Sequence, residues 1–143
     1  MRALFDVNVL IALLDQAHPH SETASSWLKA NIQHGWASCP ITQNGCIRIM
    51  SQASYSGARP VAQITERLRG ALHHSAHKFW PDDVSIVDMD IIDGGRVHSA
   101  RQITDTYLLA LAVKNGGRLV TFDSGIALSS VKGAKARHLV TLV

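Results

Sequence analysis

Apolar runs of two lengths alternate along this chain, and this alternation constrains the fold more than any other feature. Strand-length runs over residues 3–5 and 118–122 are separated by runs of helical length. The longest helical run, residues 103–113, is apolar on nearly every side and ends at Asn115-Gly116-Gly117. Strands that alternate with helices predict an α/β domain with a mostly parallel sheet.

The same patterns place the remaining elements. We expect helices over residues 7–14, 41–50 and 60–72, and strands over 36–39 and 138–143. His73, His74 and His77 are assigned to the end of the helix that begins at Pro60, where their partial charge suits the helix dipole. Residues 79–84 are predicted to form an aromatic loop that leads to a short strand.

Length and composition narrow the class of protein. A chain of 143 residues is long enough for one ordinary domain, so we expect a single domain over 1–143. No apolar run approaches the roughly 20 residues that span a bilayer, and no signal peptide is apparent, so a cytoplasmic protein with no membrane association is expected. Cys39 and Cys46 lack metal-type spacing and are expected to be reduced structural thiols.

Two of the predicted strands end in the same way, at Phe5-Asp6 and Phe122-Asp123. In a sheet of order 3-2-1-4-5 the first and fourth strands are neighbours, so both carboxylates would face one cleft. Asp105, in the first turn of the long helix, can point to the same place. Clustered carboxylates repel one another, and Mg²⁺ or Mn²⁺ relieves that repulsion, which suits hydrolysis of a phosphodiester. A simpler role for Asp6 is to cap the following helix.

Four segments of the chain resemble the signature blocks of PIN domains, and among these the VapC toxins of bacterial toxin–antitoxin pairs. The blocks are Phe5-Asp6-Val7-Asn8, Thr42-Gln43-Asn44-Gly45, Ile103-Thr104-Asp105-Thr106, and Val120-Thr121-Phe122-Asp123. The resemblance implies a PIN-like three-layer α/β/α sandwich with a mostly parallel sheet of order 3-2-1-4-5. It also implies a Mg²⁺-dependent endoribonuclease acting on structured RNA such as tRNA or rRNA, a homodimer, and inhibition by a VapB-type antitoxin.

The resemblance assigns roles residue by residue. Asp6, Asp105 and Asp123 match the acidic metal ligands of the family, and three polar residues match accompanying positions: Asn8, Thr104 and Thr121. Gln43 departs from the pattern because the family has a catalytic Glu there. Gln has no negative charge, so we expect weaker metal binding and a disarmed nuclease. An engineered substitution is our preferred origin for Gln43, and natural degeneration is the other.

The net charge of +3 permits a nucleic-acid partner without establishing one. Candidate contacts to RNA phosphates or to the antitoxin are Arg48, Arg96, Arg101, Lys132, Lys135 and Arg137. Two other functions stay open. One is an inactive PIN domain that still binds RNA or antitoxin. The other is a haloacid-dehalogenase-like phosphatase, which Asp6-Val7-Asn8 loosely resembles although the second acid of that motif is missing.

Overall fold

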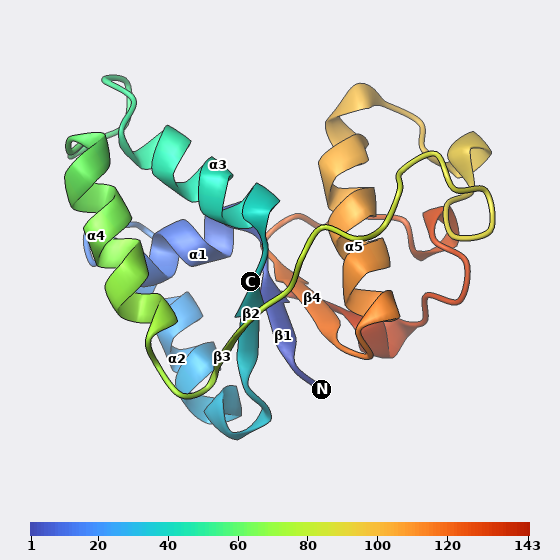
Figure 1. Ribbon diagram of the computed structural model, residues 1–143, viewed down its shortest axis with the longest axis horizontal. Coiled ribbons are helices and arrows are strands. Elements are labelled where there is room, and N and C mark those ends of the chain that lie inside the picture. The colour runs from blue at the N-terminus through green and yellow to red at the C-terminus, as the bar shows by residue number, and fades with distance from the viewer.

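Five parallel strands form one sheet at the centre of the molecule, and the computed structural model describes all residues from 1 to 143 (Figure 1). The strand order is β3-β2-β1-β4-β5. The strands are β1 (Ala3–Phe5), β2 (Trp36–Ser38), β3 (His77–Phe79), β4 (Arg118–Thr121) and β5 (Leu139–Thr141). Neighbouring strands pair in parallel throughout, with Phe5 of β1 opposite Val120 of β4. The predicted strand order is confirmed, and β1 and β4 are neighbours.

Helices cover both faces of the sheet. They are α1 (Val7–Leu14), α2 (Ser21–Asn31), α3 (Pro40–Met50), α4 (Val61–Leu72) and α5 (Ile103–Lys114). The first four lie on one side of the sheet and α5 lies on the other, which gives the two lobes visible in Figure 1. Each face has its own apolar core of 14 buried residues. The three-layer α/β/α architecture expected from the sequence is therefore confirmed.

The chain passes from β1 directly into α1 at Asp6. The Asp6 carboxylate accepts a hydrogen bond of 2.7 Å from the Val7 N–H, and the Asp6 carbonyl accepts the first helical bond, from Leu10. Asp6 is thus the N-cap of α1, as the simpler interpretation of the sequence required. This capping role does not exclude a second role, because only part of the carboxylate is used by the cap.

Helix α5 is enclosed on nearly all sides because it lies between the sheet and the irregular segment that precedes it. Its residues 106–112 are all buried, which explains the almost unbroken apolar sequence. The chain then turns back to β4 through Gly116, which has a φ of 66°. A Cβ at Gly117 would come within 2.6 Å of the Arg2 carbonyl oxygen, so only glycine permits this tight return.

The third strand is the one element that the sequence misplaced. We expected His77 at the end of a helix and a strand after residue 84, but α4 ends at Leu72 and β3 spans His77–Phe79. This strand has three residues at the sheet edge and two of them are exposed, so it lacks the apolar pattern of a buried strand. None of the helices is long and apolar enough to cross a membrane.

Candidate active site

Asp6 lies at the carboxyl end of β1, between the two lobes. Only 6% of its surface is exposed. Its Oδ2 accepts a hydrogen bond of 2.7 Å from the Thr121 hydroxyl, while Oδ1 caps α1. Burial raises the pKa of Asp6, the two hydrogen bonds oppose that rise, and the nearby Asp123 carboxylate adds to it. Asp6 is therefore a fixed, enclosed carboxylate at the switch point of the sheet.

Thr121 joins the ends of the two neighbouring strands. Its hydroxyl donates to Asp6 and accepts a bond of 3.0 Å from the Asp123 N–H. The Asp123 carboxylate is held in turn by the Gly125 N–H at 2.7 Å. Thr121 is fully buried, so water does not compete for these bonds. The polar position that the resemblance marked as supporting thus sets the relative position of two of the three acids.

Asp105 completes the acidic group from the first turn of α5. Its carboxyl is half-buried, and burial together with the charges of Asp6 and Asp123 raises its pKa to about 7. Protonated Asp105 can also hydrogen-bond to Asp123, which favours the neutral form further. The three predicted acids are therefore close enough to act on one another electrostatically, although they come from three separate segments of the chain.

The chemistry of this group fits a divalent cation. All three side chains offer oxygen ligands, and their mutual repulsion is the kind that a cation relieves. They are not drawn together into a group of three His, Cys, Asp or Glu with the spacing of a metal-binding set. Asp6 is immobilised by its two hydrogen bonds, whereas Asp123 is exposed and Asp105 is half-buried. Their convergence on one cation stays a prediction.

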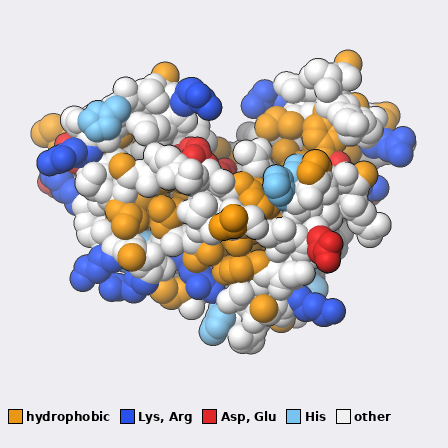
Figure 2. Space-filling view, turned by 180° about the vertical axis from the view of Figure 1, so that it is seen from behind, with side chains coloured by type: hydrophobic (Ala, Val, Ile, Leu, Met, Phe, Trp, Pro, Cys, Tyr) orange, Lys and Arg blue, Asp and Glu red, His pale blue; other side chains and the backbone are white.

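A hollow of about 420 Å³ opens beside Asp6, between α1, α3 and the start of α5. Its lining consists of Asp6, Val7, Asn8, Ile41, Asn44, Gly45, Arg48, Ile49 and Thr104. Two residues predicted from the resemblance, Asn8 and Thr104, are thus brought next to Asp6, and both are exposed. Figure 2 shows the surface hollowed between the lobes, with acidic side chains inside and Lys or Arg side chains on both sides.

Gln43 is not part of this lining and points elsewhere. Its Nε2 donates a hydrogen bond of 2.9 Å to Ser38 Oγ at the end of β2. Ser38 Oγ also lies 2.8 Å from His77 Nε2 on β3. Burial lowers the pKa of His77, the Leu72 carbonyl opposes this, and Arg2 lowers it further, so a neutral ring is favoured. Gln43 therefore ties α3 to β2 and β3.

The basic candidates differ in their freedom to bind a phosphate. Arg96 pairs with Asp93 at 3.9 Å, and Lys132 donates to the Met89 carbonyl at 2.6 Å. The other predicted contacts are exposed, and their side chains make neither an ion pair nor a hydrogen bond: Arg48, Arg101, Lys135 and Arg137. Arg48 alone lines the hollow beside Asp6.

Sequence reasoning did not single out Asn44, although it lies in the second signature block. Ile41, Asn44, Gly45 and Arg48 follow the spacing i, i+3, i+4 and i+7, so they share one face of α3. Gln43 lies off that face. The helical spacing from Arg48 was the signal that could have identified Asn44.

Comparisons with known proteins agree with this architecture. The sequence profile of the PIN domain matches residues 3–132. Ribonuclease VapC44 of Mycobacterium tuberculosis is 53% identical over 142 residues, which cover 99% of this chain and all of that protein. Ribonuclease VapC39 of the same organism is 42% identical and covers 93% of this chain and 96% of its own length.

A solved structure is also similar, that of VapBC2 from Rickettsia felis bound to a DNA fragment from its promoter. The structural alignment covers all of this chain and all of that chain, with a TM-score of 0.64 and 12% sequence identity, and it supports the fold alone. The ribonucleases of the PIN family generally depend on a divalent metal ion. The signature blocks, the sheet order and the full-length similarity to the curated ribonucleases lead to one conclusion: this chain belongs to the VapC ribonucleases of the PIN-domain family.

Proposed function

We propose that this protein is a Mg²⁺- or Mn²⁺-dependent endoribonuclease toxin of a VapBC-type module that hydrolyses phosphodiester bonds in structured RNA. The observation that carries the proposal is the hydrogen-bonded bridge from Asp6 through Thr121 to Asp123. Asp105 lies close enough for the charges of Asp6 and Asp123 to raise its pKa. A bound divalent cation supplies activation of a water molecule and stabilisation of the charge that develops on the phosphate. Asp6, Asp105 and Asp123 would hold it.

The residues of the chain prepare the site for that chemistry. Thr121 keeps the Asp6 carboxylate in one orientation, so it is a preorganised ligand. Asp105, with a pKa raised to about 7 without metal, loses its proton most readily when a cation is present. Asn8 and Thr104 offer uncharged polar groups at the edge of the same hollow.

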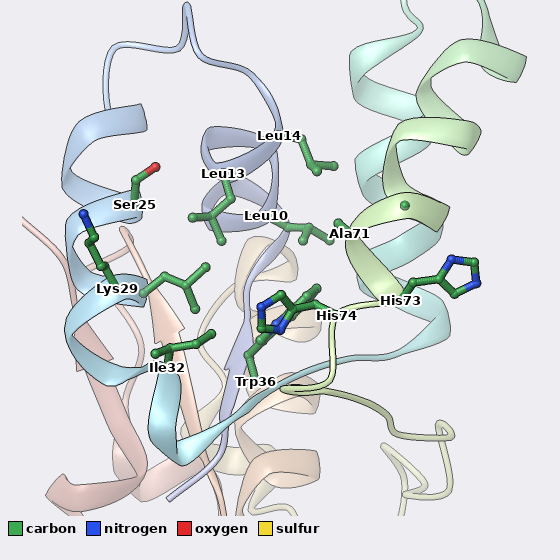
Figure 3. A pocket seen from close by; sticks show the side chains of 12 residues that line it. Leu10, Leu13, Leu14, Ser25, Lys29, Ile32, Trp36, Ala71, His73 and His74 are labelled. Carbon is green, nitrogen blue, oxygen red and sulfur yellow. The ribbon is translucent and has the colours of Figure 1, made fainter.

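A VapB-type antitoxin is the proposed partner, and a second hollow offers apolar surface for it. This hollow, of about 640 Å³, opens between α1, α2 and the end of α4. Figure 3 shows Leu10, Leu13 and Leu14 of α1 beside this space, with His74 and Lys29 near its edges. An apolar floor with basic groups around it suits an amphipathic acidic segment of a protein partner. We propose a homodimer as the form that binds it.

The test is cleavage of tRNA and rRNA by the purified protein with Mg²⁺, with Mn²⁺ and with EDTA. We expect weak cleavage with either metal, well below that of Gln43→Glu, none with EDTA, and none for Asp105→Asn. Retained RNA binding without any cleavage would favour the inactive binding module, for which the Gln43 substitution is the specific observation. A covalent phosphoryl group on Asp6 would instead identify the phosphatase mechanism.

A further inference from the structure

The hollow beside Asp6 contains polar side chains that no contact within the protein explains. Asn8, Asn44 and Thr104 all line it, and none of their side chains makes a hydrogen bond within the chain. Arg48 lines it too, without an ion pair. Each unpaired donor is solvated when the hollow is empty, and each is therefore available to a ligand.

The side chains of this lining offer suitable partners for each part of a nucleotide: its phosphate, its sugar and its base. The guanidinium of Arg48 presents a planar fork of donors that fits two oxygens of a phosphate. The amides of Asn8 and Asn44 can both donate and accept, as recognition of ribose hydroxyls or base edges requires. The remaining lining side chains are apolar and suit the face of a base or sugar: Val7, Ile41 and Ile49.

The position of the hollow fixes its relation to the chemistry. Asp6 lies in its wall and Thr104, next to Asp105, lines it too, whereas Asp105 and Asp123 themselves do not, so the hollow adjoins the acids and follows α1 and α3 from there. An RNA strand with its reacting phosphate at the three carboxylates would place an adjacent nucleotide along α3. The cation Arg48 then lies beside the acids instead of among them, which favours a neighbouring phosphate over the reacting one.

Gly45 keeps the hollow close to Asp6. A Cβ at this position would lie 2.8 Å from Val7 Cγ2, so α3 packs against α1 as closely as a glycine permits. Both helices are also anchored to the sheet, because α1 is capped by Asp6 at the end of β1 and α3 begins at Pro40, shortly after the end of β2. The polar groups are thus held by two anchored helices.

We propose that this hollow is a nucleotide subsite that binds the residue of RNA next to the reacting phosphate, with Arg48 holding its phosphate and Asn44 its sugar or base. The proposal rests on the proposed ribonuclease function and adds to it the position of the RNA, namely which nucleotide occupies the hollow when the reacting phosphate lies at the three carboxylates. The acidic segment of a protein partner is the competing occupant, since it too could pair with Arg48.

The experiment measures binding of a short, fluorescein-labelled single-stranded RNA in EDTA, where no cleavage is expected. We expect Arg48→Ala to weaken binding about tenfold and to reduce the salt dependence of log K by about 0.7, the loss of one phosphate contact. Arg69→Ala is the matched control: it removes the same charge from an exposed position on α4 and should change affinity less than about twofold.

A second series locates the contact. Single methylphosphonate linkages, which are neutral, are introduced one at a time along the RNA. At one linkage next to the cleavage position, neutralisation should weaken binding to the wild-type protein but not to Arg48→Ala, because both changes remove the same contact. At all other linkages the two effects should be additive.

Three outcomes would overturn the subsite. The first is an equal loss of RNA affinity in Arg48→Ala and Arg69→Ala. The second is additive effects of Arg48→Ala and the neutral linkage at every position of the RNA. The third is that Arg48→Ala no longer binds an acidic poly-glutamate peptide while its RNA affinity is unchanged. Failure of the proposed function has a different signature. In that case the wild-type protein and Gln43→Glu both bind the RNA in EDTA but neither cleaves it with Mg²⁺ or Mn²⁺, and the Arg48 result stands independently. Thermal unfolding of both arginine variants should match the wild type, since both side chains are exposed.

Discussion

Replacement of Asp105 by Asn should stabilise the metal-free protein, contrary to the usual effect of changing a half-buried residue. The pKa of Asp105 rises from an ordinary 3.8 to about 7 in the folded state because of burial and of the charges of Asp6 and Asp123. Each pKa unit corresponds to about 1.4 kcal/mol. The full difference would be roughly 4 kcal/mol, and we halve it to about 2 kcal/mol because the group is only half-buried and solvent screens it.

The pH dependence has a definite sign. A carboxyl whose folded pKa is raised binds its proton more tightly in the folded state, so its stabilising effect is complete below about pH 4. That contribution is lost as the pH rises to about 7, where folded Asp105 ionises. The amide of Asn cannot ionise. The gain in the free energy of unfolding from Asp105→Asn should therefore be near zero at pH 4 and complete at pH 8, where it corresponds to a rise in Tm of roughly 6 °C.

Thermal unfolding in EDTA between pH 4 and pH 8 measures this effect. Asp90→Asn is the control, because Asp90 is exposed and its carboxylate has no partner, and its Tm should follow the wild type. Added Mg²⁺ should raise the Tm of the wild type at pH 8 and leave Asp105→Asn unchanged, since ligand binding to the folded state alone stabilises it. Parallel pH profiles of the wild type and Asp105→Asn would refute the electrostatic coupling of the three acids.

Three further substitutions test other features. The departure from the family pattern predicts that Gln43→Glu raises Mg²⁺-dependent RNA cleavage about a hundredfold. Unchanged cleavage, with the new carboxylate still hydrogen-bonded to the Ser38 hydroxyl, would contradict this prediction. Thr121→Val should lower the free energy of unfolding by about 2 kcal/mol and reduce cleavage, because the buried Asp6 carboxylate and the Asp123 N–H both lose their bond to the hydroxyl, whereas Thr121→Ser should retain both; equal losses in the two variants would exclude the hydroxyl as the cause. Gly45→Ala should destabilise the protein by about 1–3 kcal/mol through its clash with Val7, and a gain in urea-unfolding midpoint would show that α3 shifts freely.

The elements that the sequence predicted well are those with strong local signals. The region of β1 and α1 is marked by an apolar run broken only at the cap Asp6, and α5 by its apolar length and the glycines after it. The alternation with helices predicted a mostly parallel sheet, and the family resemblance implied the order of its strands. The position of β3 could not be obtained in this way, since an exposed edge strand of three residues has no periodicity to detect.

The residues of the candidate site also fall into those that local sequence predicts and those that it does not. Acids at strand ends can be located from the sequence, because parallel strands deliver their carboxyl ends to one edge. The direction of a side chain on α3 depends on how that helix rotates against α1, and this is decided by the contact between Gly45 and Val7. That rotation turns Asn44 and Arg48 toward Asp6 and leaves Gln43 with Ser38, which no local pattern encodes.

The bridge through Thr121 also has a consequence for the order of events during protein synthesis. Asp6 is made well before its hydrogen-bond partner, which is 115 positions further along the chain. The Thr121 carbonyl in turn accepts a hydrogen bond from the Leu142 N–H, which comes later still in the chain. A nascent chain therefore carries its acids without the contacts that arrange them. The active arrangement is therefore expected only after β4 and the segment that contains Leu142 have been made and have joined the sheet.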